Sequence, residues 1–283
     1  MLVYFNSQYL PKETVKISPD DRGFLFADGV YEVIRAYKGR LFRMDLHLKR
    51  LARSLQELKI DGPSMARIAE ISAALIQRNN LKDADAAIYI QITRGTATRK
   101  HAFPKNAPSP TVYLNAFTVQ PPVEAWKKGA KAITTPDIRW TRCDIKSVSL
   151  LPNVLASQAA AEAGAEDAIF IRDGFVTEGS HTNVCAVFNG RLQTHPANNY
   201  ILPGVTREVV LSLCANLNIP VSQTPIPAEA LPHADEVMLL GTSTEVMPIV
   251  QIDNRQVGNG KPGPVTRNLQ KAFGQLTAPA AHR

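Results

Sequence analysis

The chain has 283 residues, enough for one large domain or two smaller ones, and its 45% hydrophobic and 20% charged content is ordinary for a soluble globular protein. Its net charge of +7 comes from scattered lysines and arginines, so we expect no nucleic-acid partner but some attraction for anionic substrates. No stretch predicts a membrane span or a secretory signal, and the separated Cys143, Cys185 and Cys214 indicate reduced thiols in a cytoplasmic protein, with no metal-ligand spacing.

The first part of the chain is expected to form strands followed by two helices. Residues 2–43 carry apolar and polar side chains in rough alternation, with turn residues between them, which predicts a β-meander. Asp45 is placed to cap a helix that runs to about Ile60, with leucines at the spacing of a buried stripe. A second helix is expected to begin at Ser64 and to end near Asn80.

A cleanly alternating strand and a polar loop follow these helices. Residues 86–95 alternate so that the isoleucines of the strand share one face. The strand opens into a loop over residues 95–110, which is rich in glycine and proline and places Arg99 and His101 two residues apart. Taken alone, an arginine and a histidine in such a loop are usually only solvated.

A domain boundary is expected where two prolines follow each other at Pro121 and Pro122, because they interrupt regular structure. We therefore predict an N-terminal α/β domain over residues 1–117, a linker over 118–123 and a C-terminal domain over 124–283. The second domain should contain hairpins and helices, with a disordered tail. Hairpin turns are predicted at Asp173-Gly174 and Asn189-Gly190. One helix is predicted over about 151–163, and a second begins after Pro203-Gly204 and has an apolar side that ends at Leu217. A third helix is predicted over about 263–273, and the tail at 277–283 is expected to be disordered.

Three places combine residue types that suit chemistry, although each also has a plain structural explanation. Lys146 lies between apolar residues, which disfavour its ammonium form and let its amine attack a carbonyl, but a solvated lysine is commoner. Val205 and Thr206 occupy a helix start whose N–H groups favour a phosphate, as at any helix start. Gly241 and Thr242 end an apolar strand with backbone donors and can equally form an ordinary turn.

A resemblance to a known family strengthens these candidates. The segments DIKSVSLLPNVLASQAAAEAG (144–164) and VTEGSHTNV (176–184) resemble the lysine and glutamate motifs of the fold-type IV enzymes that use pyridoxal 5'-phosphate (PLP). The likeness is greatest to the D-amino acid aminotransferases of that family and extends from about Val3 to Phe273. It implies an α+β fold of two domains with the active site between them, PLP as cofactor, and a homodimer.

The resemblance also implies roles for individual residues. The matching positions give three groups: Lys146 as the Schiff-base lysine and proton carrier, with Glu178 as partner of the pyridine nitrogen; Arg50, Val205, Thr206, Gly241 and Thr242 around the cofactor phosphate, with Leu202 against its ring; and Tyr31, Arg99 and His101 around the substrate carboxylate. Two positions depart from the relatives' pattern. Gly241 offers only its backbone where relatives often carry serine, and Lys100 stands where they tend to have a small residue.

The function implied is transamination between D-amino acids and 2-oxo acids, for example from D-alanine to 2-oxoglutarate. Alternatives within the fold are a branched-chain L-amino acid aminotransferase, an (R)-amine transaminase and an aminodeoxychorismate lyase. The Arg99–His101 pair favours the D-amino acid group among these. An alternative of another class is a basic binding protein without catalysis, which would lack the yellow colour of a PLP enzyme.

Overall fold

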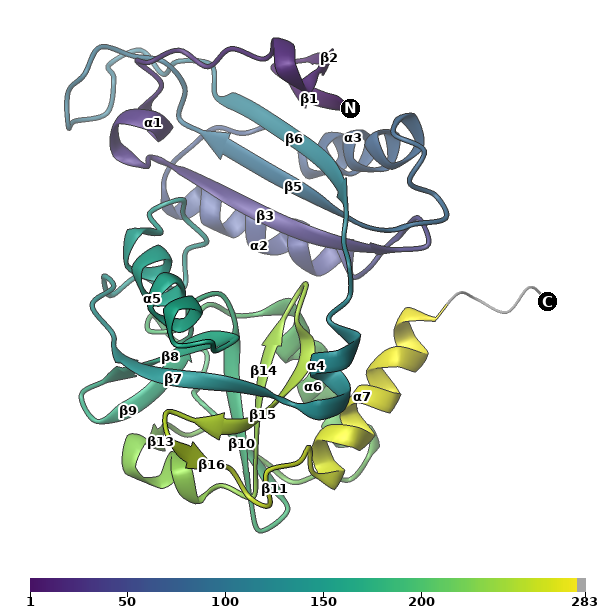
Figure 1. Cartoon of the computed structure of the whole chain (residues 1–283). Helices are drawn as coiled ribbons and strands as arrows, with labels where there is room; N and C mark the ends of the chain where they lie inside the picture. Colours follow the sequence, from purple (N-terminus) through teal and green to yellow (C-terminus); the bar gives the residue numbers. More distant parts are fainter. Residues whose placement is uncertain (279–283) are drawn as a thin grey trace. The chain divides into compact units, whose positions relative to one another are not determined.

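The computed structural model describes residues 1–278 and divides into two compact units. The first comprises Met1–Gln120 with the separate segment Ile145–Ser149, and the second comprises Pro121–Asp144 with Leu150–Ala278. The short segment that carries Lys146 is therefore counted with the first unit, although it follows residue 124, where we expected the C-terminal domain to begin. The α+β class is confirmed, since both units combine helices with a sheet (Figure 1).

The first unit is built on a six-stranded sheet in the order β2-β1-β6-β5-β3-β4, in which every neighbouring pair is antiparallel. Its strands are β1 (Leu2–Phe5), β2 (Gln8–Pro11), β3 (Gly29–Tyr37), β4 (Arg40–Leu41), β5 (Asp85–Thr93) and β6 (Thr111–Thr118). The predicted meander over residues 2–43 is wrong, because β1 pairs with β6 and β3 with β5. Alternation identifies strands but carries no information about which strands become neighbours.

Helices cover one face of this sheet (Figure 1). They are α2 (Met44–Glu57) and α3 (Met65–Arg78), preceded in the chain by the short 3-10 turn η1 (Lys12–Thr14) and helix α1 (Arg22–Phe26). Ile88, Ile90 and Ile92 are fully buried in the core that α2 and α3 share with the sheet, as their common face predicted. The opposite face of the sheet carries Tyr31 of β3 and Tyr89 of β5, whose rings stack 5.9 Å apart.

The two helix starts agree with the sequence to different degrees. Ser64 caps α3 as predicted, since its hydroxyl accepts a hydrogen bond from the Arg67 backbone N–H at 3.2 Å. Asp45 does not cap α2; Arg43 occupies the cap position in a left-handed conformation, and Asp45 lies in the first turn. An acidic residue there still interacts favourably with the helix dipole. Helix α2 also ends at Glu57, before the expected Ile60.

The second unit is organised around strands that close on themselves. Neighbouring pairs run β10-β14-β15-β7-β8-β9, and β9 pairs again with β10, which gives a barrel-like circuit. Its strands are β7 (Ala130–Pro136), β8 (Asp167–Arg172), β9 (Phe175–Gly179), β10 (Asn183–Phe188), β11 (Arg191–Thr194), β12 (Val221–Ser222), β13 (Ile226–Pro227), β14 (Glu236–Gly241), β15 (Glu245–Ile252) and β16 (Arg255–Gln256). The parallel pairs β15–β7 and β7–β8 sit beside antiparallel hairpins.

Both predicted hairpin turns in this unit are confirmed. Asp173 and Gly174 join β8 to β9 with φ values of 51° and 80°, and Asn189 and Gly190 join β10 to β11 with φ values of 50° and 74°. Positive φ at both central positions matches the twist of the flanking strands, and asparagine, aspartate and glycine tolerate it best.

The helices of the second unit are α4 (Val123–Lys128), α5 (Leu151–Glu162), α6 (Val205–Asn216) and α7 (Pro264–Thr277), with the 3-10 segment η2 (Ala228–His233). Leu217 follows α6 and is 40% exposed, so its predicted place on the apolar side of that helix is wrong. Helix α7 extends past Phe273, and of the expected tail, residues 279–283 lie outside the described part of the chain. None of the helices within residues 1–278 is long and apolar enough to cross a membrane.

Candidate active site

Lys146 is fixed by backbone bonds to the edge of strand β3. Its carbonyl accepts from the Tyr31 backbone N–H at 3.0 Å, and the Val148 N–H donates to the Gly29 carbonyl at 3.0 Å. The Lys146 N–H in turn donates to the Ser54 hydroxyl of α2 at 3.2 Å. These bonds define where the side chain leaves the backbone, and a nucleophilic group needs such a fixed origin.

The Lys146 side chain is half-buried and reaches over an aromatic ring. Its Nζ atom lies 4.2 Å from the centre of the Tyr31 ring, so the structure brings together two residues that the resemblance assigned to the same site. Tyr31 stacks on Tyr89, and burial, with smaller effects from Tyr31 and Tyr113, raises the pKa of Tyr89 to about 12. The Tyr89 hydroxyl donates to Gln91 Oε1 at 2.6 Å, so Tyr89 supports the Tyr31 ring from a fixed position.

Arg50 of α2 binds the buried carboxylate of Glu32, which lies on the face of β3 opposite Tyr31. Its Nε donates to Glu32 Oε1 at 2.7 Å and its Nη2 to Glu32 Oε2 at 2.9 Å, while His47 Nδ1 lies 2.8 Å from Oε2. Burial alone would raise the pKa of Glu32, but Arg50 and His47 outweigh it and hold that pKa far below its ordinary value. Burial lowers the pKa of His47.

Sequence reasoning missed this triad, although a signal for it was present. Glu32 falls on the face of β3 that also carries Ile34, so it had to be buried together with an apolar core. A buried carboxylate requires a partner, and α2 supplies two. Arg50 is thus held rigid by Glu32, in a bidentate geometry that fixes the plane of its guanidinium.

Glu178 is the focal acidic group of the second unit. It is 5% exposed at the end of β9, and its Oε2 accepts from the Leu202 backbone N–H at 2.9 Å and from Asn183 Nδ2 at 3.1 Å. Its Oε1 accepts from Arg139 Nη1. Burial raises the pKa of Glu178 to about 6 despite the opposing attraction of Arg139, so the carboxyl group is mostly ionised at neutral pH.

Arg139 is held by a second acid and was not singled out from the sequence. Its Nε and Nη2 atoms donate to Asp137 at 2.9 and 2.8 Å, and Arg172 also donates to Asp137 at 3.0 Å. Burial would raise the pKa of Asp137, but Arg139 and Arg172 outweigh it and lower that pKa to about 2. Asp137 therefore stays charged and keeps the guanidinium aimed at Glu178.

The turn between β9 and β10 is pinned by a fully buried aspartate. Asp167 accepts from the Ser180 backbone N–H at 3.0 Å, from the Ser180 hydroxyl at 2.5 Å and from the Thr182 hydroxyl at 2.7 Å. Asn183, which bonds Glu178, follows directly after this turn. The position of the Glu178 carboxylate thus depends on a network of buried, satisfied polar groups, which gives local rigidity.

The start of α6 lies beside this network. Asn183 also donates to the Leu202 carbonyl at 2.9 Å, and a Cβ atom on Gly204 would come within 1.9 Å of the Asn183 side-chain oxygen. Gly204 caps α6 without a side-chain hydrogen bond, and Val205 and Thr206 in the first turn of the helix are buried. Such a start suits an anion.

The second predicted phosphate turn connects β14 to β15. Gly241 pairs with Glu245 across the hairpin, and Thr242 lies half-buried in the turn between them. A Cβ atom at Gly241 would approach the Thr244 hydroxyl to 3.2 Å and a methyl group of Thr182 to 3.3 Å. Gly241 therefore leaves this turn open where a larger residue would crowd it.

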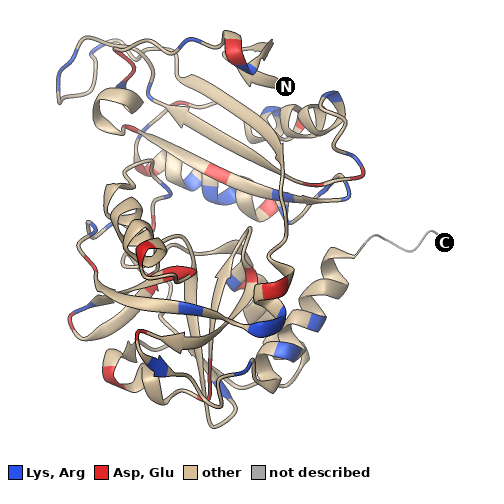
Figure 2. Ribbon diagram, in the orientation of Figure 1, with Lys and Arg blue, Asp and Glu red and all other residues tan. Residues whose placement is uncertain are grey.

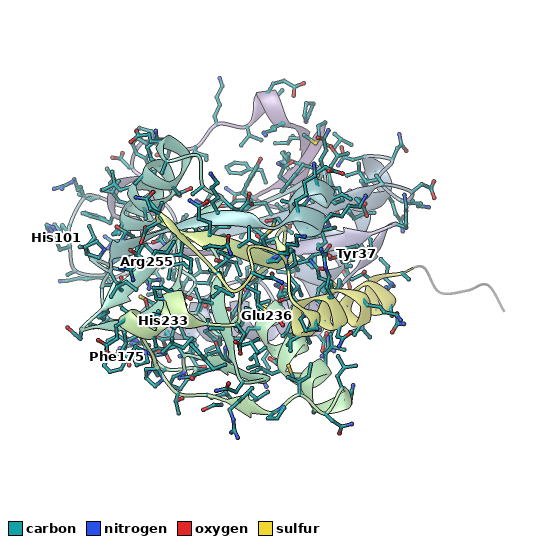
Figure 3. The ribbon with its side chains drawn as sticks, turned by 60° about the horizontal axis from the view of Figure 1, so that its bottom comes forward. Tyr37, His101, Phe175, His233, Glu236 and Arg255 are labelled. Atoms are coloured by element: carbon teal, nitrogen blue, oxygen red, sulfur yellow. The ribbon has the colours of Figure 1, made fainter. Side chains whose placement is uncertain are left out.

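Arg99 and His101 also belong to the first unit. Both are exposed, and His101 appears at the left edge of Figure 3. Within residues 1–278, no hydrogen bond or ring contact joins either of them to Tyr31 or Lys146. Both instead contact Phe26 of α1. Of the three predicted carboxylate-binding residues, only Tyr31 contacts the lysine within the described chain.

Each unit carries groups that fit a part of PLP. A half-buried lysine amine suits an aldehyde, an ionised carboxylate that three donors hold in place suits a pyridine N–H, and an uncapped helix start with an open glycine turn suits a phosphate. Figure 2 shows the basic residues of the described chain spread over both units.

Comparisons with known proteins agree with these features. The model of the family described as amino-transferase class IV matches residues 29–252. The chain is 43% identical over 272 residues to the D-alanine aminotransferase of Staphylococcus haemolyticus, covering 96% of both chains, and 41% identical over 274 residues to that of Bacillus licheniformis, again covering 96% of both.

Solved structures give a second comparison. The branched-chain amino acid aminotransferase of Escherichia coli superposes with a TM-score of 0.91 at 28% identity, covering 98% of this chain and 94% of that one. Another branched-chain amino acid aminotransferase, solved with pyridoxamine 5'-phosphate, superposes with a TM-score of 0.89 at 27% identity, with the same coverage.

Proposed function

Because this chain belongs to the amino-transferase class IV family, we propose that it is a PLP-dependent aminotransferase that transfers amino groups between D-amino acids and 2-oxo acids. The carrying observation is the 43% identity to a D-alanine aminotransferase over 96% of both chains. The two solved branched-chain enzymes share the fold at 28% and 27% identity, and they define the competing candidate, an aminotransferase for branched-chain L-amino acids.

PLP, when bound, supplies the electron sink for bonds at the substrate α-carbon. The protein supplies the groups that bind, orient and move protons. Lys146 provides the amine that holds the cofactor, and the same Nζ atom takes the proton from the substrate α-carbon once the substrate has displaced it. The Tyr31 ring under Nζ and the backbone bonds to β3 orient this amine.

Glu178 accepts the hydrogen bond of the pyridine N–H in this proposal. Its three protein donors hold the carboxylate still, and the raised pKa of about 6 gives it a strong affinity for a shared proton while leaving it ionised at neutral pH. Arg139 limits that affinity, because a buried glutamate without Arg139 would tend to be protonated, and Asp137 holds the Arg139 guanidinium in place.

The phosphate is assigned to the N–H groups at Val205 and Thr206 and to the turn at Gly241 and Thr242, with Arg50 adding a guanidinium that Glu32 holds in place. Leu202 presents its backbone to Glu178, and its half-buried side chain is assigned to the cofactor ring.

The substrate carboxylate is assigned to Tyr31, Arg99 and His101. Arg99 and His101 are exposed and do not contact Lys146 within the described chain, which supports a homodimer in which the Arg99–His101 segment of one subunit completes the site of the other. The three buried free cysteines support a protein that works in the reducing cytoplasm.

Half-reactions with paired enantiomers test the proposal. The yellow PLP form is mixed with D-alanine, L-alanine, D-leucine or L-leucine, and loss of its absorption is followed in a stopped-flow spectrometer. We expect the D-amino acids to react faster than their L partners. A preference for L-leucine would replace this proposal with the branched-chain alternative.

A further inference from the structure

The loop that carries Arg99–His101 is attached to helix α1 and the residues before it by hydrogen bonds, the first of which join backbone groups. The Ala97 N–H donates to the Asp20 carbonyl at 3.2 Å, and the Arg22 N–H donates to the Gly95 carbonyl at 3.0 Å. Gly95 has φ of +94°, and a Cβ atom there would come within 2.1 Å of the Ser109 carbonyl oxygen, so the two ends of the loop meet closely at its base.

Arg22 continues this attachment towards the tip of the loop. It is 3% exposed, and its Nη1 donates to the Lys100 carbonyl at 2.6 Å and its Nη2 to the His101 carbonyl at 3.3 Å. Its Nε donates to Asp28 at 2.8 Å. The buried Arg22 guanidinium thus donates to two consecutive carbonyls of the loop and fixes the position of its backbone.

Asp28 binds a second arginine, Arg94, in addition to Arg22. Arg94 donates to both oxygens of Asp28, at 2.7 and 2.9 Å, and its guanidinium lies 3.7 Å from the ring centre of Phe103, at the other end of the tip. Burial would raise the pKa of Asp28, but the hydrogen bonds from Arg94 and Arg22 outweigh it and lower that pKa. Asp28 therefore stays charged and holds both arginines at any pH near neutral.

Phe26 contacts the side chains that the loop presents. Its ring centre lies 5.2 Å from the Arg99 guanidinium carbon and 5.3 Å from the centre of the His101 ring, and the Arg22 guanidinium carbon lies 4.9 Å from it. One aromatic ring thus restricts both functional side chains, while Arg22 restricts the backbone that carries them.

We propose that Arg22 and Phe26 are positioning residues that preorganise the Arg99–His101 segment for the substrate carboxylate. The inference rests on the proposed function, because it takes Arg99 and His101 as the carboxylate-binding residues. An exposed arginine otherwise samples many rotamers, and ordering it on binding weakens affinity. The Phe26 ring and the Arg22 guanidinium order the segment before the substrate binds, so binding does not include this entropic cost. Loss of either group should therefore weaken binding of the carboxylate more than it slows the later proton transfer.

The test compares Phe26→Leu with Phe24→Leu in the holoenzyme. Both changes replace a phenylalanine of α1 by leucine, but Phe24 is 76% exposed and makes no ring contact to the described loop. We expect Phe26→Leu to raise KM for D-alanine by about five- to tenfold with little change in kcat, since it removes ring contacts to two side chains. Phe24→Leu should match the wild type. Arg22→Lys keeps the charge beside Asp28 but cannot reach both carbonyls, and it should raise KM further.

Limited trypsin digestion supplies a readout that does not depend on activity. Trypsin cleaves after Arg99 and Lys100, so its rate at these bonds, relative to other sites of the same chain, measures the freedom of the loop. We expect faster relative cleavage in Phe26→Leu and wild-type cleavage in Phe24→Leu. Wild-type KM and wild-type cleavage in Phe26→Leu would overturn the inference. If the wild-type enzyme fails to react with D-alanine, the proposed function is wrong, and the cleavage ratio alone then decides whether Phe26 anchors the loop.

Discussion

At the scale of single residues, the chemistry depends on how buried charges are partnered. Glu178 and Glu32 are both buried carboxylates, yet burial dominates at Glu178, whose pKa rises to about 6, while Arg50 and His47 dominate at Glu32 and hold its pKa far below the ordinary value. Both carboxylates accept three hydrogen bonds, but Glu32 takes two of them from the Arg50 guanidinium, whereas Glu178 takes one from Arg139 and its pKa is also raised by the nearby negative charge of Asp137. Glu178 keeps a proton affinity that suits a pyridine nitrogen.

The raised pKa of Glu178 predicts a pH dependence of cofactor binding. Only the ionised carboxylate can accept the pyridine N–H, so the affinity of the apo protein for PLP should fall by up to about tenfold per pH unit as the pH drops below about 6. The phosphate of PLP also titrates near pH 6. The phosphate titration is the same for the wild type and for Glu178→Gln, so the difference between their pH profiles isolates the contribution of Glu178. The affinity of the wild type for PLP should show the steeper decline.

The same substitution should also slow the reaction. Glu178→Gln keeps the shape of the side chain but removes the negative charge, so the pyridine nitrogen loses the partner that keeps it protonated. We expect kcat to drop by roughly ten- to a thousandfold, which corresponds to about 1.4–4 kcal/mol in the barrier. Wild-type kcat in this variant, measured with D-alanine and 2-oxoglutarate, would rule out Glu178 as the partner.

At the scale of elements, the sequence predicts the turns and helix caps that depend only on neighbouring residues. Asn189-Gly190 and Asp173-Gly174 impose hairpins because their backbones accept positive φ, and Ser64 caps the helix that follows it. The pairings of β1 with β6 and of β3 with β5, and the ion pairs Glu32–Arg50 and Arg139–Glu178, join residues far apart in the chain. No local pattern encodes those pairings. Lys146 and Glu178 were predicted as site residues through motif resemblance, whereas the groups that contact them could be found only in the structure.

Helix α7 offers a stability prediction at this scale. Glu236 of β14, labelled beside this helix in Figure 3, accepts from the backbone N–H groups of Val265 and Thr266 at 2.9 and 2.7 Å and from the Thr266 hydroxyl at 2.6 Å. Glu236→Gln turns one acceptor into a donor that faces these donors. We expect the free energy of unfolding to fall by about 1–3 kcal/mol, measured by urea denaturation.

A matched control separates this capping role from the loss of charge as such. Glu229 is an exposed residue of η2, so Glu229→Gln removes the same charge without a buried bond and should leave the stability within about 0.5 kcal/mol of the wild type. Equal stability of the two variants would show that Glu236 does not secure the start of α7.

At the scale of the whole molecule, the proposal requires two copies of the chain. The Arg99–His101 segment is exposed and makes no contact with Lys146 within residues 1–278, so we expect an active enzyme to be a homodimer in light scattering. Arg99→Ala should then weaken D-alanine binding, with KM raised by about tenfold or more, because a charge-assisted contact is lost. A fully active monomer, or unchanged D-alanine kinetics in Arg99→Ala, would contradict this arrangement.

The account as a whole depends on Lys146 as the residue that carries the cofactor. Borohydride reduction of the yellow holoenzyme fixes PLP to its lysine, and peptide mapping by mass spectrometry then locates the added mass. We predict one labelled peptide, with the label on Lys146, and no label in Lys146→Ala treated in the same way. A label on another lysine, or an unlabelled chain after reduction of the yellow protein, would contradict the assignment of this segment as the centre of the enzyme.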